Sequence, residues 1–296
     1  MTDQVLSALS APGTSAGLNV PRHRRGVLRW WVLALLIAFL AFMLAPIFLA
    51  LNNALKSAAD YATNGPLALP TSLDFTGVVG FWDYVDFPKK LWNSLLLSAC
   101  AALFGVALSL FNAYAIGIGR IKGGRVMLVI LLLGIMIPQE SLVYPLYYIA
   151  KSVGIYDSLF SVIIIFTVLQ SIFGTYLLSA VLTSFPREIL EAARVDGANR
   201  WQILWYVITP ILRPTLAVLA TFYFIWTWNE FLIPLVLLIS NTNQTVSVAL
   251  GNLSGQYVSQ PTITAAASLL GILPTVIFFL IFQRTLTKGV VVGAVK

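Results

Sequence analysis

The stretch that decides the fold is EAARVDGANRWQILWYVITP, which runs from Glu191 to Pro210. It carries four charged residues, whereas the segments on both sides of it are almost uniformly apolar. Charged side chains are costly inside a bilayer, so a hydrophilic stretch between two long apolar segments is expected to leave the membrane. The stretch therefore predicts a loop that projects from the membrane between two spans.

The apolar segments around this loop have the length and composition of membrane helices. Of the 296 residues, 59% are hydrophobic and 10% are charged, whereas roughly a quarter of an average soluble domain is charged. A spanning helix needs about 20 mostly apolar residues, and six windows meet this requirement, at about 28–51, 93–118, 126–150, 158–181, 214–240 and 264–283. We expect kinks at Pro46, Pro138 and Pro145. The predicted fold class is an all-α membrane protein with six transmembrane helices.

The N-terminal residues differ in character from the rest. Residues 1–27 are expected to form a disordered basic tail, and residues 28–296 the membrane domain, with its core at about 90–285. The first apolar run, of about 22 residues, is too long for the hydrophobic region of a signal peptide and lacks a clear cleavage site. It is therefore predicted to remain as the first span.

Basic residues indicate the orientation of the chain. With the N-terminus inside, the inner segments carry fourteen Lys and Arg residues and the outer segments four, and such an excess marks the cytoplasmic side. Both termini and the loop 182–213 are expected to be cytoplasmic. Topology accounts for the net charge of +7, so nucleic acid is not an expected partner.

The chain lacks the groups that enzymatic chemistry needs. Its one cysteine, Cys100, lies in the second span and its one histidine, His23, in the basic tail, so neither a His/Cys metal site nor a Ser/His/Asp triad is predicted. The segment GRIKGGR at 119–125 has Arg125 where a phosphate-binding Walker loop needs Lys, and Val126 where it needs Ser or Thr. We expect no catalytic residue, metal or cofactor on this chain.

The projecting loop reads as two short helices joined at a glycine. Ser184 is expected to cap the first helix, and Gly197 suits the left-handed position that ends it. The second helix is predicted from about Asn199 to Ile208, with apolar residues on one face at Trp201, Leu204, Trp205 and Ile208. From this periodicity alone, a helix that rests in the lipid headgroup layer fits as well as one that docks to a partner.

Three motifs, in order, resemble permeases of ATP-binding-cassette (ABC) importers, and specifically carbohydrate permeases of the maltose-transporter type. The first is Glu-Ala-Ala, three residues and Gly in the loop, the second is TWNEFLIPLVLL at 227–238, and the third is FQRTLTKGVVVGAVK at 282–296. The similarity covers essentially residues 25–296. Val207 and Thr209 depart from the Ile-x-Leu-Pro that is usual in the family, which puts only the exact packing there in doubt.

The resemblance implies the type I importer permease fold and a permease subunit that imports a neutral mono- or oligosaccharide by alternating access. It implies that the loop 182–213 docks to a separate ATPase through Glu191, Ala192, Ala193, Asp196, Gly197, Arg200, Trp201 and Pro210. The C-terminal tail, with Lys288, Gly289 and Gly293, would insert between two ATPase subunits.

The resemblance also implies the partners and the location. ATP and Mg would be bound by the ATPase dimer, and a second permease subunit, a paralogue or a second copy, would complete the pathway. A substrate-binding protein outside the cytoplasm would meet the outer segments 52–92 and 241–263. The location implied is the cytoplasmic (inner) membrane of a bacterium or archaeon, with the chain crossing the bilayer several times.

Two carboxylates lie inside apolar segments, and intramembrane ionisable groups are functional candidates by default. On straight helices, Glu140 and Glu230 would lie about 21 and about 24 Å from the inner ends of their spans, at similar depths. A substrate pathway suited to a polyhydroxylated ligand is predicted around them, formed by Glu230, Asn229, Trp228, Trp226, Glu140, Gln139, Tyr144 and Gln170. The alternative is that these groups satisfy each other, or a partner subunit, at helix contacts.

Other functions and contacts remain open at this stage. The absence of Lys and Arg within the spans favours neutral sugars over phosphorylated ones, but a permease for a polyol or a sugar phosphate is an alternative. An ion-coupled secondary transporter usually calls for acid or base relays or for broken helices in matched halves, which two Glu and no visible repeat support poorly. Small residues on one face of the second span predict a close contact with another helix of this chain or with another subunit, at Ala101, Gly105, Ser109, Ala113 and Gly117.

Overall fold

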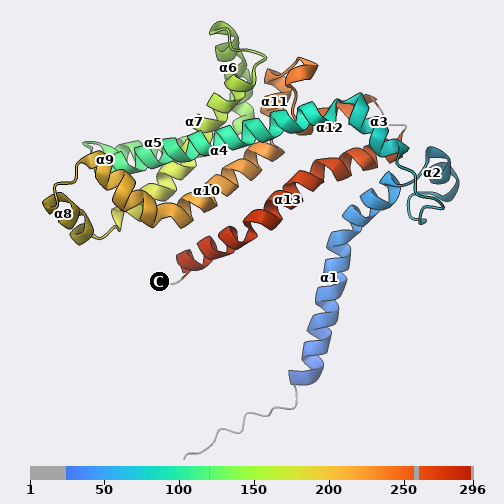
Figure 1. Cartoon of the computed structure of the whole chain (residues 1–296), viewed down its shortest axis with the longest axis horizontal. Coiled ribbons are helices and arrows are strands. Elements are labelled where there is room, and N and C mark those ends of the chain that lie inside the picture. The colour runs from blue at the N-terminus through green and yellow to red at the C-terminus, as the bar shows by residue number, and fades with distance from the viewer. Residues whose placement is uncertain (1–24, 120, 257–259, 295–296) are drawn as a thin grey trace, which may run out of the picture. The chain divides into compact units, whose positions relative to one another are not determined.

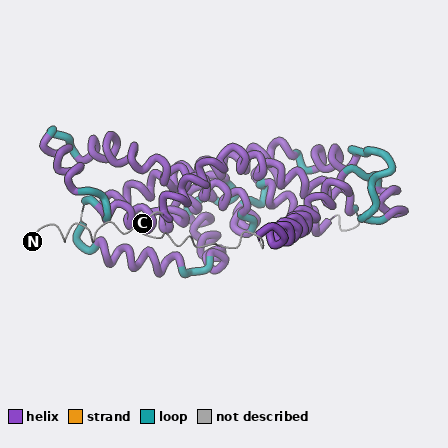
Figure 2. The backbone as a smooth tube through the Cα atoms, turned by 90° about the horizontal axis from the view of Figure 1, so that it is seen from below, coloured by secondary structure: helices purple, strands orange, loops and turns teal. Residues whose placement is uncertain are grey.

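The computed structural model describes residues 25–119, 121–256 and 260–294. Every regular element in these ranges is helical (Figure 2), which confirms the predicted all-α class. Five of the helices are long and apolar enough to cross a membrane, or six spans result if one sharply bent pair is counted as a span. This agrees with the six predicted windows.

The helices lie in the following order (Figure 1). They are α1 (Arg25–Ala54), α2 (Ala58–Asn64), α3 (Thr76–Tyr84), α4 (Phe87–Gly117), α5 (Gly124–Ile135), α6 (Gln139–Ser152), α7 (Leu159–Thr183), α8 (Arg187–Val195), α9 (Arg200–Gln202), η2 (Ile203–Ile208), α10 (Thr209–Asn229), α11 (Leu232–Leu237), η3 (Asn241–Asn243), α12 (Val246–Gln256) and α13 (Pro261–Ala294).

The chain divides into two units, one up to Phe48 and the other from Leu49 onward. Most of α1 belongs to the first unit. Its apolar part, Arg29–Ala54, has 26 residues, so it is long enough to cross a bilayer by itself. Pro46 lies inside this helix and does not end it.

The centre of the second unit is formed by α4, α7 and α10, and the small residues of α4 face this contact. Ala101, Ser109 and Ala113 are fully buried. A Cβ atom on Gly105 would lie 3.1 Å from the ring of Tyr223 on α10, and one on Gly117 would lie 2.9 Å from Leu182 Cβ on α7. The close contact predicted for this face is therefore made with helices of the same chain.

Tyr223 connects the three helices through buried hydrogen bonds. Its hydroxyl donates to the Gln170 carbonyl at 2.5 Å and lies 3.1 Å from Ser109 Oγ. Opposite this hydroxyl lies Gly174, where a Cβ atom would come within 2.1 Å of the tyrosine oxygen. Polar groups that have no water partner in a membrane must find one in the protein, and this cluster supplies it.

The third predicted span is not one kinked helix but two helices bent by 99°. The break falls between Ile135 and Gln139, and Pro138 occupies the N-cap position of α6. A residue that precedes proline is disfavoured in the α conformation, so the helix stops before Ile137. Pro145 lies inside α6 without ending it. The straight-helix depth expected for Glu140 is therefore wrong.

The fifth predicted span, 214–240, is also interrupted. Helix α10 ends at Asn229, Glu230 has an extended backbone (φ −69°, ψ 133°), and α11 begins at Leu232. The cause is Pro234, because a proline ring clashes with the carbonyl four residues earlier, here that of Glu230, and cannot donate to it. Both carboxylates predicted inside the membrane thus lie at helix breaks.

The two segments expected outside the membrane, 52–92 and 241–263, are largely folded. Phe81 and Phe87 pack with Val246 and Leu253 in one buried cluster that joins α3 and α4 to α12. At the other end of α4 lie α8 and α9, as Figure 1 shows. The second unit therefore carries the projecting loop and these folded segments at its opposite ends.

Candidate functional site

The first helix of the projecting loop, α8, ends at the predicted left-handed glycine. Gly197 has φ +80°, and its N–H donates to the Arg194 carbonyl at 3.0 Å. A Cβ atom on this glycine would meet nothing within 4 Å. The backbone conformation, and not a lack of space, is therefore what favours glycine here.

The caps of the loop helices differ from the prediction. Ser184 does not cap α8, because its hydroxyl donates to the Val181 carbonyl at 2.9 Å in the last turn of α7. The cap that the structure does contain is at α9, where Asn199 Oδ1 accepts from Gln202 N at 2.9 Å and Gln202 Oε1 accepts from Asn199 N at 2.8 Å. This reciprocal pair is a capping box, and the spacing of Asn199 and Gln202 was the signal for it in the sequence.

The second loop helix is not separate from the fifth span, as predicted, but continues into it. One helical rod runs from Arg200 to Asn229, and its second turn, Ile203–Ile208, is a π-helix. The hydroxyl of Thr209 donates to the Leu204 carbonyl at 2.8 Å. Pro210 is the second residue of α10 and directly follows the π-helix and Thr209, and the rod continues through it.

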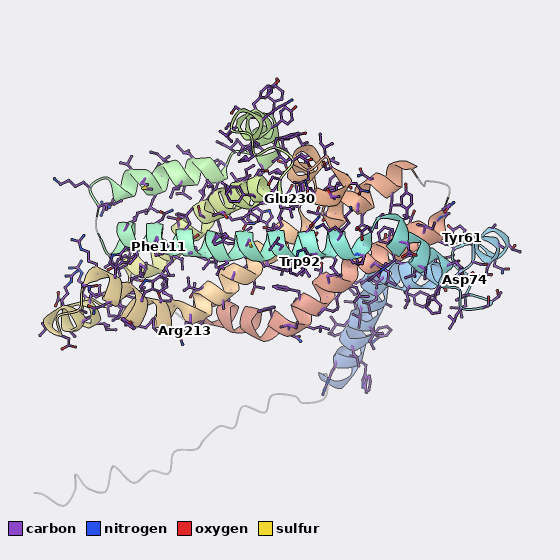
Figure 3. The ribbon with its side chains drawn as sticks, turned by 45° about the horizontal axis from the view of Figure 1, so that its top comes forward. Tyr61, Asp74, Trp92, Phe111, Arg213 and Glu230 are labelled. Atoms are coloured by element: carbon purple, nitrogen blue, oxygen red, sulfur yellow. The ribbon has the colours of Figure 1, made fainter. Side chains whose placement is uncertain are left out.

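The apolar face predicted on this helix is only partly buried. Leu204 and Ile208 are 1% and 0% exposed, and Ile203, which the prediction omitted, is 3% exposed. The two tryptophans lie largely exposed, each with its ring 6.1 Å from that of Phe111. A π-helix turns more widely than the 3.6 residues assumed for the prediction, which changes the residues that share a face. Figure 3 labels Phe111 on α4.

The loop is attached firmly to the bundle while its charged side chains face outward. Leu190 and Ala193 on α8 pack into the core cluster, and the hydroxyl of Tyr114 on α4 donates to the Arg200 carbonyl at 2.9 Å. The remaining residues of the predicted docking set are exposed or half-buried, namely Glu191, Ala192, Asp196, Gly197, Arg200, Trp201 and Pro210. Helix α9 therefore continues directly into α10, and α8 is held against the same bundle by its buried residues.

Glu230 lies at the far end of α10 from Arg213 (Figure 3), and it lines one pocket together with Glu140. This pocket, called the acidic pocket below, has a volume of about 320 Å³ and is lined by Gln139, Glu140, Trp226 and Glu230 together with apolar residues of α5 to α7. Glu140 is in the first turn of α6, where a helix dipole favours a negative charge. The lining, all of it within the described residues, contains no Lys or Arg.

Other members of the predicted pathway lie elsewhere. Trp228 is 5% exposed and stacks on Phe224, with centroids 6.0 Å apart, in an apolar groove of α10 and α13. Gln170 is buried, and its amide donates to Thr227 Oγ1 at 2.6 Å. The structure does not bring these two residues to the acidic pocket, because Trp228 lines the apolar groove and Gln170 lies in the contact of α7 with α10.

Two further predicted residues are exposed near the breaks. Tyr144 on α6 is 70% exposed and its hydroxyl donates to that of Tyr148 at 3.1 Å. Asn229 is exposed, and its side chain donates to the Ile225 carbonyl at 2.7 Å. For the tail residues Lys288, Gly289 and Gly293, the backbone lies in α13, and their side chains lie outside the described part of the structure.

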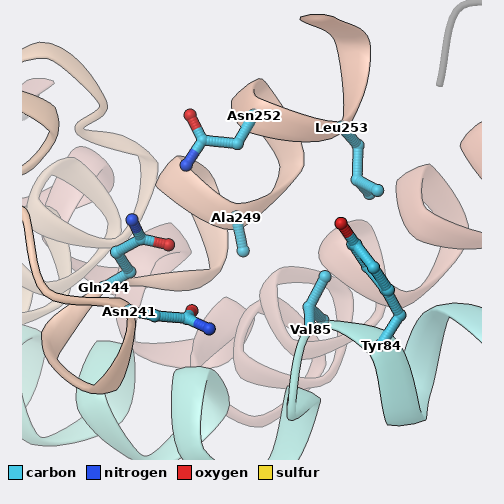
Figure 4. Close-up of a pocket in the computed structure, with 7 residues that line it drawn as sticks. All are labelled: Tyr84, Val85, Asn241, Gln244, Ala249, Asn252 and Leu253. Carbon is cyan, nitrogen blue, oxygen red and sulfur yellow. The ribbon is translucent and has the colours of Figure 1, made fainter. Parts of the chain in front are cut away.

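A second pocket, which the sequence did not predict, lies between α3 and α12 (Figure 4). This amide pocket has a volume of about 350 Å³ and presents the side chains of Tyr84, Asn241, Gln244 and Asn252. From α4, Asn93 fixes its floor by donating to the carbonyls of Thr242 at 2.8 Å and Gln244 at 2.9 Å, and the ammonium of buried Lys90 donates to that of Asn241. Lys90 and Asn93 thus bind the backbone carbonyls of this segment, while the side chains of Asn241 and Gln244 line the pocket.

Residues 105–292 match the family described as "Binding-protein-dependent transport system inner membrane component". The chain is 30% identical over 236 residues to the lactose transport system permease protein LacG of Rhizobium radiobacter, covering 78% of this chain and 84% of that protein. It is 31% identical over 269 residues to the trehalose transport system permease protein SugB of Mycobacterium tuberculosis, covering 90% and 97%.

A solved structure has the same fold. It is the crystal structure of a bacterial ABC transporter involved in the import of the acidic polysaccharide alginate. The match has a TM-score of 0.70 at 25% identity and covers 87% of this chain and 96% of that one. The similarity extends over most of both chains.

Proposed function

The chain belongs to the family of binding-protein-dependent transport system inner membrane components, and on that premise we propose that it is the permease subunit of an ATP-driven importer of neutral oligosaccharides. It is a multi-pass membrane protein of the bacterial inner-membrane type. The family match over residues 105–292 is the observation that carries the proposal, since these residues contain both the projecting loop and the acidic pocket.

The projecting loop supports a coupling role toward a separate ATPase dimer, which would bind ATP and Mg. Helices α8 and α9 present exposed charged groups, while the rod from Arg200 to Asn229 connects the loop to Glu230. Closure of the ATPase dimer against the loop would therefore move the end of α10 that borders the acidic pocket. The tail 289–296 would contact the same ATPase, and its deletion should lower substrate-stimulated ATP hydrolysis.

The acidic pocket supports a neutral substrate. A uronate sugar would bring negative charge toward Glu140 and Glu230, and the lining offers no basic side chain to offset the repulsion. Of the relatives, two are named for lactose and trehalose transport and one structure for alginate. Since the pocket lies at breaks in two helices, both carboxylates face a space that a hydrated sugar can enter. A second permease subunit would close its open side.

This substrate preference is tested with Glu140→Gln/Glu230→Gln. Removal of both charges should leave uptake of a neutral disaccharide within a few fold of wild type while increasing inhibition by a uronate oligosaccharide of equal length. The conservative Glu140→Asp/Glu230→Asp variant, which keeps the charges, serves as the control and should exclude the uronate as wild type does. Equal exclusion by the Gln variant would show that charge in this pocket does not select the substrate.

The amide pocket supports an encounter with a substrate-binding protein, which the family name implies. Its amides and tyrosine suit hydrogen bonds to a protein surface or to sugar hydroxyls.

Affinity purification of the tagged chain after crosslinking is the test of the assembly. We expect an ATP-binding-cassette subunit, a second permease and, with sugar present, a binding protein. Recovery of the chain alone, with uptake driven by a proton or sodium gradient, would favour a secondary transporter.

A further inference from the structure

We propose that a cavity between the α4–α5 turn and the α7–α8 turn binds the headgroup of an anionic phospholipid. This interfacial cavity has a volume of about 660 Å³. Its polar part is formed by Arg125, Thr183 and Arg187, and its apolar part by Ile116, Val126 and Leu128.

The polar part of the cavity offers positive charge, and its lining, as far as the structure describes it, holds no acidic side chain. Neither Arg125 nor Arg187 forms an ion pair with any acidic side chain in the described part of the structure, and no Asp or Glu lines the cavity. Each guanidinium presents five N–H donors in a planar fork that matches phosphate oxygens. The hydroxyl of Thr183 is already directed to the Ser179 carbonyl at 2.7 Å, so the two arginines are the groups that would bind an anion.

The start of α5 adds to this charge. Gly123 occupies its N-cap position with φ +84°, and no side chain caps the helix there. The backbone N–H groups of the first turn, next to Arg125, therefore lack a side-chain acceptor, and the helix dipole favours an anion at this end. This contribution accompanies the two guanidinium groups and does not replace them.

The apolar part of the cavity distinguishes a lipid from other anions. Ile116 is in the last turn of α4, and Val126 and Leu128 are in the first turns of α5, two helices with the composition of membrane spans. The cavity thus joins arginines to apolar walls where α4 ends and α5 begins. A phospholipid has the same order of groups, whereas a soluble phosphate or an acidic side chain of a protein would use only the polar part. Basic pockets between spans are known to bind anionic headgroups.

Such a lipid would also affect the projecting loop. Arg187 is the first residue of α8 and Thr183 the last residue of α7, so a headgroup held by both arginines would connect the start of the loop to α5. Binding is therefore expected to stabilise the position of α8 relative to the bundle. The lipid composition of the membrane would then influence the coupling of the loop to its partner.

The test measures lipid binding by the protein in its purified, assembled form. The complex is released from nanodiscs that contain equal amounts of phosphatidylglycerol and phosphatidylcholine, and the retained lipids are counted by native mass spectrometry. Arg125→Gln/Arg187→Gln should retain one phosphatidylglycerol fewer and bind it roughly 30-fold more weakly, since two basic contacts are removed. The control is Lys122→Gln, because Lys122 lies in the turn between α4 and α5 but does not line the cavity. This variant should retain lipid as wild type does.

Other outcomes would overturn the proposal. Millimolar inorganic phosphate is added to wild-type protein as a competitor. If it lowers the retained phosphatidylglycerol to the level of the double variant, the cavity binds free anions and not lipid. Loss of a protein subunit from the double variant in both phosphatidylglycerol and phosphatidylcholine would make the arginines a protein contact. If the Gln variant does not fold, Arg125→Lys/Arg187→Lys replaces it, and unchanged phosphatidylglycerol affinity in that variant would contradict a role for the guanidinium forks.

Discussion

Position 174 has no room for a side chain, because a Cβ atom there would lie 2.1 Å from Tyr223 Oη and 2.3 Å from Ser109 Oγ. Gly174→Ala should therefore break the hydrogen-bonded contact of α4, α7 and α10 and destabilise the bundle by about 1–3 kcal/mol, the usual cost of overpacking. The measurement is thermal unfolding in detergent. Gly80→Ala is the matched control, since a Cβ atom at Gly80 meets nothing within 4 Å; equal midpoints for the two variants would contradict the packing described.

Asp157, in the turn between α6 and α7, fixes the segment that leads to the amide pocket. Burial acts to raise the pKa of its carboxyl group, but hydrogen bonds from Ser240 and Asn243 outweigh this effect, and the pKa is lowered. A carboxyl whose pKa is lower in the folded state stabilises it above the unfolded pKa, about 3.9, and the stabilisation is lost as pH falls through the folded pKa.

This pKa shift leads to a prediction for Asp157→Asn. The variant keeps a residue that tolerates the left-handed backbone at this site, φ 55°. At neutral pH its free energy of unfolding should be lower than that of wild type by an amount on the order of 1 kcal/mol, the typical value of such a hydrogen bond, and its thermal midpoint should be lower accordingly. The difference should begin to shrink as pH falls below about 3.9, and it should disappear only below the lowered pKa of the folded wild type, where the Asp157 carboxyl is protonated. A difference that is constant across this range would mean that the charge does not matter.

At the scale of an element, the glycine joint of the loop is the part that most directly tests coupling. Gly197→Pro requires φ near −65°, against the +80° observed, and should separate α8 from α9 and abolish substrate-stimulated ATP hydrolysis while membrane insertion continues. Gly197→Asn, which accepts positive φ, should keep most of the stimulation. Glu191→Lys, exposed on α8, should resemble the Pro variant. Full stimulation in Gly197→Pro, with the ATPase bound, would remove the loop from the coupling route.

Element boundaries show where the sequence was sufficient and where it was not. The six apolar windows, the left-handed Gly197 and the outward charges of the loop follow from length and residue type, and the structure has them. The break at Pro138 was predicted only as a kink, and the break before Pro234 was not predicted. The reason is that an apolar window describes composition and not the hydrogen bonding of the backbone. The π-helix from Ile203 to Ile208 changes the number of residues per turn. A search for a 3.6-residue period cannot detect this change.

For the whole molecule, the family and the all-helical class were predictable, but the partners of individual side chains were not. Periodicity places Gln170 and Trp228 on helices, yet the bond of Gln170 to Thr227 depends on how α7 meets α10, and the apolar groove that holds Trp228 depends on how α10 meets α13. The sequence singled out both Glu140 and Glu230, but it did not show the helix breaks at which the structure brings them to one pocket. The amide pocket joins segments about 160 residues apart, Tyr84–Val85 and Asn241–Leu253, so local sequence contains no signal that they meet.

The central claim is that this chain uses ATP hydrolysed by another subunit to import a neutral oligosaccharide. The most direct measurement is uptake of a labelled disaccharide into proteoliposomes that contain the assembled complex, with the binding protein outside and ATP inside. We predict uptake that requires both ATP and the binding protein, that persists when ionophores collapse the proton and sodium gradients, and that is lost in Gly197→Pro. Uptake that continues without ATP and stops with the ionophores would contradict the account.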